Sequence, residues 1–154
     1  MGEYQATVNW ERHGATFTDQ KYSRAHSWVF DGGLTVPAAA SPHLVARPFT
    51  SEAAVDPEEA FVASLSSCHM LWFLSIAAGE GFVVDSYRDH AVGVLAKNPE
   101  GRLAMTEVTL APVVVFAGRT PPAEILEGLH ARAHEACFIA NSVRTTVTVR
   151  SGGG

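Results

Sequence analysis

The sequence predicts an α+β fold in which antiparallel sheets are wrapped around one buried central helix. Residues 56–81 carry a helix start, a long apolar stretch and closing glycines. The stretches on either side alternate between apolar and polar residues, which indicates strands with one buried face. With 154 residues, 47% of them hydrophobic and 18% charged, the composition is that of a globular domain. We expect a single domain at residues 1–150 and a flexible glycine-rich tail at residues 151–154.

The central helix has a well-defined start. Asp56 is a suitable N-cap residue, and Pro57 fits the first helical position. Glu58 and Glu59 put negative charge in the first turn, where the helix dipole favours it. Residues 60–78 are apolar or small on every face, so we expect this helix to be buried on all sides. Its length would also cross a membrane, but no second span, basic flank or aromatic belt accompanies it, which favours a core helix and no membrane partner.

The N-terminal part predicts a meander of three antiparallel strands. Residues 4–10 alternate and predict a strand with one buried face. Residues 26–30 predict a second strand, which the turn Asp31-Gly32-Gly33 reverses into a third strand at residues 34–36. Residues 37–55 contain three prolines and no periodicity. They predict a long loop, and loops of this length inside a domain are often functional.

After the central helix, the sequence predicts a long β-hairpin. Residues 83–97 and 102–117 are expected to form its two strands around the turn Asn98-Pro99-Glu100-Gly101. The run of apolar residues 113–116 indicates that the end of the second strand is fully buried.

The C-terminal part predicts a second helix and a last strand. Thr120-Pro121-Pro122 marks the helix start, and apolar residues recur at helical spacing from there toward Cys137. Residues 143–149 alternate between apolar and polar and predict the final strand. No internal repeat and no linker divides the chain.

Charge and targeting signals narrow the class of protein. The net charge is −5, and the eleven lysines and arginines form no basic run, so a nucleic-acid partner is not expected. The first ten residues have neither the basic region nor the apolar region of a secretory signal, which predicts a cytoplasmic protein. In a reducing compartment, a disulfide between the two cysteines is expected to be catalytic or redox-sensing.

The two cysteines are candidates for thiol chemistry. Cys68 lies in the middle of the predicted helix and Cys137 at the end of the second helix, and neither forms the Cys-x-x-Cys pair of a thioredoxin motif or a zinc site. Cysteines often only fill space in a core, and this structural interpretation stays open. Ser66 and Ser67, however, leave room for a substrate beside Cys68. A reactive thiolate in this apolar position would need a nearby cation, and arginine suits that role.

These residues resemble a known family. The string DPEEAFVASLSSC at residues 56–68, followed by a second cysteine at the end of a later helix, is similar to the OsmC/Ohr family. Residues 22–33, YSRAHSWVFDGG, look like the N-terminal sheet of that family, so the similarity covers nearly the whole chain. The sequence His69-Met70-Leu71-Trp72 looks like the OsmC-like branch. The resemblance therefore implies an OsmC/Ohr-like fold.

The resemblance also implies a thiol peroxidase with defined residue roles. Cys68 corresponds to the peroxidatic thiol that attacks a hydroperoxide, and Cys137 to the resolving thiol that closes a disulfide. Glu58, ten residues before Cys68, corresponds to the family's glutamate, and its partner arginine best matches Arg24, with Arg47 as the competing match. A dithiol reductant, expected to be of the lipoyl type, would reopen the disulfide. No cofactor and no metal are expected.

The spacing of Glu58 and Cys68 predicts a homodimer. Ten residues of straight helix rise about 15 Å, which is too far for an arginine held by Glu58 to reach Cys68 of the same helix. Unless the helix is broken, Glu58 and its arginine must therefore act on the thiol of a second chain. We expect an intertwined homodimer with two composite sites.

Two other function classes remain open beside the peroxidase. Cys68 with His134 would suit a Cys-His hydrolase or acyl-transferase, whereas a non-enzymatic dimer would use the cysteines only to sense redox state or would bind a ligand. His69 points to another face of the helix than Cys68 and is expected to be a packed or interface histidine. For the peroxidase, organic hydroperoxides are favoured over hydrogen peroxide because we expect an apolar site, lined by Phe61, Leu65, Phe138 and Ile139.

Overall fold

The computed structural model describes residues 1–150, and the predicted tail at residues 151–154 lies outside the described residues. The chain divides into two compact units, Met1–Ala60 and Phe61–Gly154. The boundary falls in the first turn of the long helix α1 (Pro57–Gly79), which contributes its N-terminal turn to the first unit and its remainder to the second.

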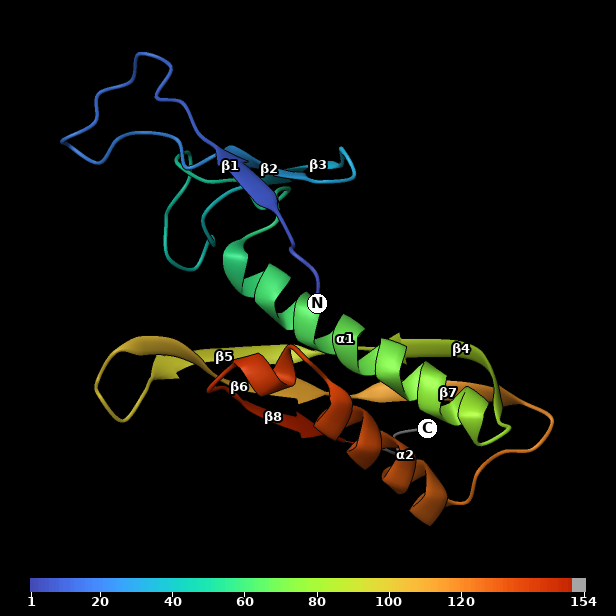
Figure 1. Ribbon diagram of the computed structural model, residues 1–154. Coiled ribbons are helices and arrows are strands. Elements are labelled where there is room, and N and C mark those ends of the chain that lie inside the picture. The colour runs from blue at the N-terminus through green and yellow to red at the C-terminus, as the bar shows by residue number, and fades with distance from the viewer. Residues whose placement is uncertain (151–154) are drawn as a thin grey trace. The chain divides into compact units, whose positions relative to one another are not determined.

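The first unit contains a three-stranded antiparallel sheet in the order β1-β2-β3 (Figure 1). Its strands are β1 (Ala6–Asn9), β2 (His26–Phe30) and β3 (Thr35–Ala38). The predicted meander and its turn are confirmed, with Gly33 at φ +84°, a conformation that favours glycine. The buried face predicted for the first strand is wrong within this chain, because every residue of β1 is exposed.

The long loop after β3 is also confirmed, with one addition. Pro37 and Ala38, predicted as loop, belong to β3. Ala38 also forms an isolated parallel bridge with Val55, so the two ends of the loop lie side by side. The hydroxyl of Thr50 donates a hydrogen bond to the carbonyl oxygen of Ala40 and closes the loop internally. The loop thus returns the chain to the sheet just before α1 begins.

Helix α1 begins with reciprocal capping at its N-terminus. The backbone N–H of Glu59 donates to Oδ1 of Asp56 at 2.7 Å, and the N–H of Asp56 donates to Oε2 of Glu59 at 3.2 Å. This capping box satisfies two N–H groups that would otherwise lack partners. The predicted cap at Asp56 is confirmed, and Glu59 has a specific role beyond its charge.

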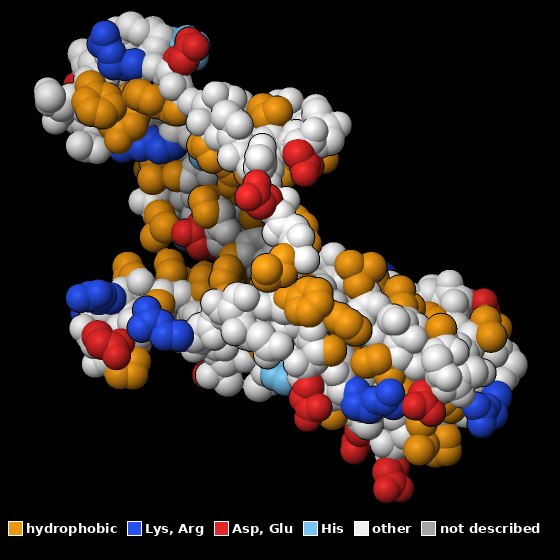
Figure 2. Space-filling model, viewed as in Figure 1, with side chains coloured by type: hydrophobic (Ala, Val, Ile, Leu, Met, Phe, Trp, Pro, Cys, Tyr) orange, Lys and Arg blue, Asp and Glu red, His pale blue; other side chains and the backbone are white. Residues whose placement is uncertain are grey.

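Burial of α1 differs from the prediction. The residues buried within the chain are Leu65, His69, Phe73 and Ala77, spaced by four and therefore on one face. Side chains on the other faces are exposed or half-buried, with Leu71 61% exposed, and hydrophobic side chains are visible along α1 in Figure 2. The expectation of burial on every side is thus wrong for the single chain. The helix is long and apolar enough to span a membrane, but its buried stripe packs in two core clusters.

Each of the two long strands predicted for the hairpin is divided into two. The first becomes β4 (Val83–Asp89) and β5 (Val92–Lys97), and the second becomes β6 (Leu103–Leu110) and β7 (Pro112–Ala117). Strand β4 pairs with β7, and β5 pairs with β6 around the predicted turn. The division lies where Oδ1 of Asp89 accepts the backbone N–H of Ala111 at 2.7 Å. Full burial of residues 113–116 is wrong, because Val113 and Val115 are 47% and 50% exposed.

The last strand departs from the antiparallel prediction. Strand β8 (Thr146–Val149) pairs parallel to β6 in a three-stranded sheet of order β5-β6-β8. The predicted second helix is α2 (Ala123–Ala136), followed by a short 3-10 helix, η1 (Ala140–Ser142). One core cluster joins α1, α2, β4 and β7, and the other joins α1, β6 and β8. Figure 1 shows α2 beside the second half of α1, and this contact positions the candidate site.

Gly93 marks a close approach between α1 and β5. A Cβ atom at this position would lie 2.5 Å from Cε of Met105 and 2.5 Å from Cγ2 of Val62. The flexible Met105 side chain has room to adjust, whereas the β-branched Val62 has few rotamers available. We expect Gly93→Ala to lower the free energy of unfolding by about 1–3 kcal/mol, measured by urea denaturation.

Gly128 provides the matched control for this substitution. It lies in α2, and a Cβ atom there would have no heavy atom within 4 Å. Gly128→Ala should stabilise the protein by about 0.5–1 kcal/mol, because alanine favours the helix. Equal effects of the two substitutions would show that the approach of α1 to β5 is not tight.

Candidate active site

The two cysteines, which are 69 positions apart in sequence, meet where α1 and α2 pack together. Cys68 is half-buried in the middle of α1, and Cys137 is the buried C-cap residue of α2. The Cys68 side chain lies close enough to the Cys137 thiol to raise its pKa, and both are free thiols. Two neighbouring thiols need only a small movement to form a disulfide. This juxtaposition carries the chemistry of the site.

The surroundings of Cys137 keep it protonated. Burial raises the pKa of the Cys137 thiol, and the contact with Cys68 raises it further. The backbone N–H groups of Ala140 and Ile139 lower the pKa in part, and the N–H of Ala140 lies 3.4 Å from the sulfur. Cys137 is therefore the buried and protonated thiol of the pair, whereas Cys68 is half-buried.

A buried histidine pair joins α1 to α2, and its first member, His69, directly follows Cys68 in the sequence. Nε2 of His69 and Nδ1 of His130 are 3.1 Å apart and share one hydrogen bond between α1 and α2. The His130 ring also stacks on Phe73 at a centroid distance of 4.3 Å. Burial lowers the pKa of His69 and of His130 to about 4, so both rings are neutral at pH 7. His69 is thus a packed residue, as expected.

A second polar contact fixes α1 against the strands. Oγ of Ser66 donates a hydrogen bond to Oδ2 of Asp89 at the end of β4. The negative charge of Asp89 acts on both buried histidines in the direction that raises their pKa, but burial outweighs it. Ser66 therefore anchors the helix instead of only leaving room beside Cys68.

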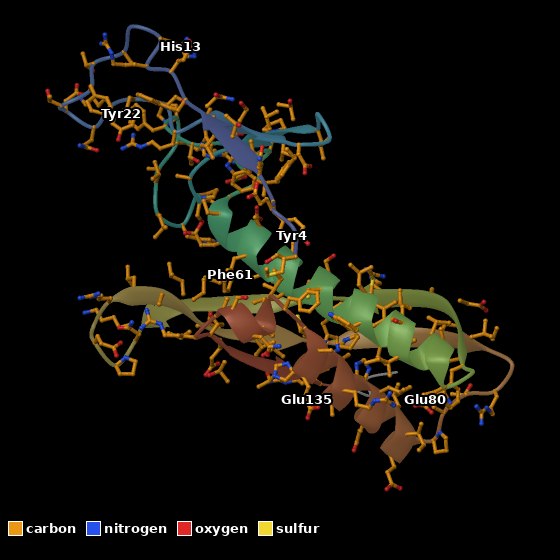
Figure 3. All side chains as sticks on the ribbon, in the orientation of Figure 1. Tyr4, His13, Tyr22, Phe61, Glu80 and Glu135 are labelled. Atoms are coloured by element: carbon orange, nitrogen blue, oxygen red, sulfur yellow. The ribbon has the colours of Figure 1, made fainter. Side chains whose placement is uncertain are left out.

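Glu58 and the two candidate arginines do not pair as predicted. Nη1 of Arg24 donates to the carbonyl oxygens of Gln20 at 2.7 Å and Tyr22 at 2.6 Å, and its guanidinium lies 3.9 Å from the centre of the Tyr22 ring. Tyr22 is labelled in Figure 3, in the loop between β1 and β2. Arg47 instead forms an exposed ion pair with Glu52. Both guanidinium groups are thus engaged elsewhere within the chain.

Glu58 keeps an unfilled bonding position. Its Oε2 atom is buried, and within residues 1–150 it has no hydrogen-bond partner. Leaving a carboxylate oxygen buried without a partner costs free energy. This atom is therefore suited to accept a hydrogen bond from a cationic side chain. The expected ion pair of Glu58 with Arg24 is therefore absent from this arrangement of the chain, although the acceptor for it is in place.

Other predicted site residues divide between core and surface. Leu65 is fully buried, and Phe61 and Ile139 pack against its cluster, so these three belong to the core. Phe138 is 67% exposed and contacts Trp72. No hydrogen bond links Cys68 to His134 in the part of the chain that the structure describes, so the geometry required for a Cys-His hydrolase is not present.

Sequence reasoning missed three residues of this region. His130 lies seven residues before Cys137, which is two helical turns, and this spacing could have placed it on the same face. Trp72 follows Cys68 by four residues in α1, and this spacing could likewise have placed it beside Cys68. Asp89 gives no such signal, because its contact with Ser66 joins distant segments.

Comparison with known proteins identifies the family of the chain. Residues 50–151 match the family described as OsmC-like protein. The chain belongs to the OsmC-like family. An OsmC-like protein of unknown function from Vibrio cholerae is 56% identical, with a TM-score of 0.94 over 97% of this chain and 99% of that one. The α+β fold of the OsmC-like family is thus confirmed, while the homodimer stays a prediction.

More distant OsmC-like structures share the fold. An organic hydroperoxide resistance protein from Legionella pneumophila is 19% identical, with a TM-score of 0.69 over 97% of this chain and 95% of its own. The organic hydroperoxide resistance protein OhrB of Bacillus subtilis is 20% identical, with a TM-score of 0.68 over 97% and 96%. No protein with a curated description matches the sequence significantly. These two structures therefore share the fold of this chain.

Proposed function

We propose that this protein is a thiol peroxidase that reduces organic hydroperoxides. The observation that carries the proposal is the contact between the half-buried Cys68 and the buried Cys137, held on two different helices. One accessible thiol and one protected thiol in contact are what a two-cysteine peroxidase requires. Membership of a family that includes organic hydroperoxide resistance proteins supports the same reaction.

The proposed reaction has two steps in the protein. The Cys68 thiolate attacks the outer oxygen of the hydroperoxide, the O–O bond breaks, and the alkoxide leaves as an alcohol after taking up a proton. Cys68 is then a sulfenic acid. The Cys137 sulfur attacks the Cys68 sulfur, the S–O bond breaks, and the hydroxyl leaves as water with the Cys137 proton. The thiols lose two electrons and the hydroperoxide gains them.

Glu58 and an arginine complete the proposed site. A guanidinium beside Cys68 would stabilise the thiolate and then the departing alkoxide, and Glu58 would hold that guanidinium by a charge-assisted pair. The buried Oε2 atom of Glu58 supports this role, because it is an acceptor without a donor. Arg24 is the proposed partner, with Arg47 as the alternative.

The course of α1 supports a composite site in a homodimer. The helix is continuous from Pro57 to Gly79, so the rise of about 15 Å between Glu58 and Cys68 is not shortened by a break. In the proposed dimer, Glu58 and its arginine therefore serve Cys68 of the second chain. The exposed apolar faces of α1 support a second chain as their cover.

A dithiol would complete the proposed cycle by reducing the Cys68–Cys137 disulfide. A dithiol of the lipoyl type suits this step, because its first sulfur forms the mixed disulfide and its second sulfur closes the exchange.

Intact-mass measurement tests the proposed function. After one equivalent of cumene hydroperoxide, the wild type should lose about 2 Da as the disulfide forms, and Cys137→Ser should gain about 16 Da as a sulfenic acid. Addition of dihydrolipoamide should return the wild type to its starting mass with multiple turnovers. An unchanged mass, or stoichiometric oxidation without turnover, would reject the peroxidase. An acyl adduct formed from an ester substrate would favour the hydrolase.

A further inference from the structure

Two aromatic residues join α1 to the end of α2 beside the thiols. The rings of Trp72 and Phe138 meet edge to face, with centroids 5.4 Å apart and an interplanar angle of 88°. Trp72 follows Cys68 by four residues on α1, and residues at this spacing are neighbours on a helix surface. Phe138 is the residue directly after Cys137. The aromatic contact thus bridges the same two elements as the thiol contact.

The turn that carries Cys137 is closed mainly by its own hydrogen bonds. The N–H of Asn141 donates to the carbonyl oxygen of Cys137 at 3.0 Å, and Oγ of Ser142 donates to that of Phe138 at 2.7 Å. These bonds keep the turn in shape but do not tie it to α1. On its inner side Ile139 packs against the core cluster of Leu65. On its outer side, the Phe138 ring reaches back to Trp72.

Phe138 is too exposed to be a core residue. Its side chain is 67% exposed, although its ring edge contacts Trp72, which is half-buried and packs against the core. An exposed phenylalanine adds little to global stability, but an edge-to-face pair adds a directional attraction. The contact therefore serves to hold a local position more than to support the fold.

We propose that Trp72 and Phe138 form an aromatic latch that holds the resolving Cys137 beside Cys68 during disulfide closure. This proposal rests on the proposed peroxidase function. Oxygen adds to Cys68 on its accessible side, and the buried Cys137 sulfur must then attack the Cys68 sulfur from the side opposite the S–O bond. The rate of disulfide formation then depends on how long Cys137 stays within reach of Cys68. The latch holds the backbone of Cys137 against α1.

The latch matters because closure competes with a second oxidation. The Cys68 sulfenic acid either reacts with the Cys137 thiol, releasing water, or with a second hydroperoxide, which adds another oxygen and gives the sulfinic acid and an alcohol. The second reaction ends the catalytic cycle. A turn that drifts from α1 slows the first reaction and leaves the second unchanged, so the latch protects the enzyme from inactivation.

Rapid-quench measurements separate the latch from the first chemical step. In Phe138→Ala and Trp72→Ala, the rate of Cys68 oxidation by hydrogen peroxide should equal that of the wild type. The rate of disulfide closure, followed by thiol alkylation and intact mass, should fall roughly three- to tenfold, the factor expected for losing one aromatic pair. The fraction of sulfinic acid at high peroxide should rise by a similar factor. The double variant should be no slower than Trp72→Ala alone, because both changes break the same contact.

Matched controls make the result decisive. Phe138→Tyr keeps the ring and should close at the wild-type rate, whereas Phe138→Leu keeps an apolar side chain without the ring and should remain slow. Ile125→Ala removes an exposed apolar side chain of α2 that belongs to neither core cluster and should close normally. Thermal unfolding of the reduced variants checks that the fold is retained.

The outcomes distinguish failure of the latch from failure of the proposed function. If the peroxide oxidises Cys68 neither to the disulfide in the wild type nor to the sulfenic acid in Cys137→Ser, the peroxidase itself is rejected. If the wild type closes its disulfide and Phe138→Ala closes it equally fast, the latch is rejected and the peroxidase stands. A change in Phe138→Ala confined to the KM for cumene hydroperoxide would also reject the latch, because the ring would then only contact the substrate.

Discussion

Cys68→Ser is expected to reduce hydroperoxide turnover to the uncatalysed rate, and a mixed dimer with Glu58→Gln chains is expected to restore about half of the wild-type activity. Serine lacks the ionisable sulfur that attacks the peroxide, so the first loss is complete. Glu58→Gln removes the carboxylate proposed to hold the arginine and should lower turnover on the order of tenfold or more. In the mixed dimer, one composite site is doubly damaged and the other has both native residues.

Differently tagged chains, co-expressed and purified through both tags, provide the heterodimer for this assay. Each variant mixed with itself is the control, because neither homodimer contains a native site. A heterodimer no more active than its parents, or a chain that sediments only as a monomer, would contradict the composite site. The assay is repeated with Arg24→Gln and with Arg47→Gln in place of Glu58→Gln. The arginine that acts on Cys68 is the one whose variant is inactive as a homodimer and regains activity in the heterodimer with Cys68→Ser.

Stability is expected to fall as the pH drops from about 6.5 toward 4. Burial lowers the pKa of His69 and His130 to about 4, below the ordinary value near 6.5 that applies in the unfolded chain. The unfolded state therefore binds protons first, and the stability present above pH 6.5 is lost through this window. Each histidine contributes at most about 1.4 kcal/mol per pH unit. His134 lowers the pKa of His69 further, and Asp89 opposes the shift in both rings.

Urea denaturation between pH 7.5 and 4 measures this dependence. A second proton on the pair would set two N–H groups against each other across the 3.1 Å contact. His130→Gln removes one titrating ring and should make the dependence on pH about half as steep. His90 is exposed, so His90→Gln should leave the slope unchanged. A flat stability profile between pH 7 and 5 in the wild type would contradict burial as the cause.

Local signals explain why α1 was predicted so closely. Its cap at Asp56, the proline after it and the closing glycines act through neighbouring residues, and the helix ends at Gly79 as expected. The division of the long strands depends instead on Asp89, whose carboxylate accepts a bond from Ala111 across the sheet. The alternation of apolar and polar residues carries no information about such a contact, so it predicts continuous strands.

The sequence likewise predicts part of the candidate site. Two cysteines in a family-like sequence predict a pair of thiols, and the structure brings their side chains into contact. The ion pair of Glu58 with Arg24 was not found, because the guanidinium of Arg24 binds carbonyl oxygens of its own loop. The contact of Trp72 with Phe138 joins α1 to the turn after α2, and no local pattern predicts it.

The parallel pairing of β8 with β6 has a consequence for the order of folding. Strands β5 and β6 are joined by a tight turn, so they are expected to meet early, at little cost in loop entropy. Strand β8 reaches β6 only after the intervening segment, which includes α2 and Cys137, has been arranged. The two sulfurs are therefore expected to come together late in folding. An oxidant that meets the newly made chain would then oxidise Cys68 before Cys137 is in place to form the disulfide.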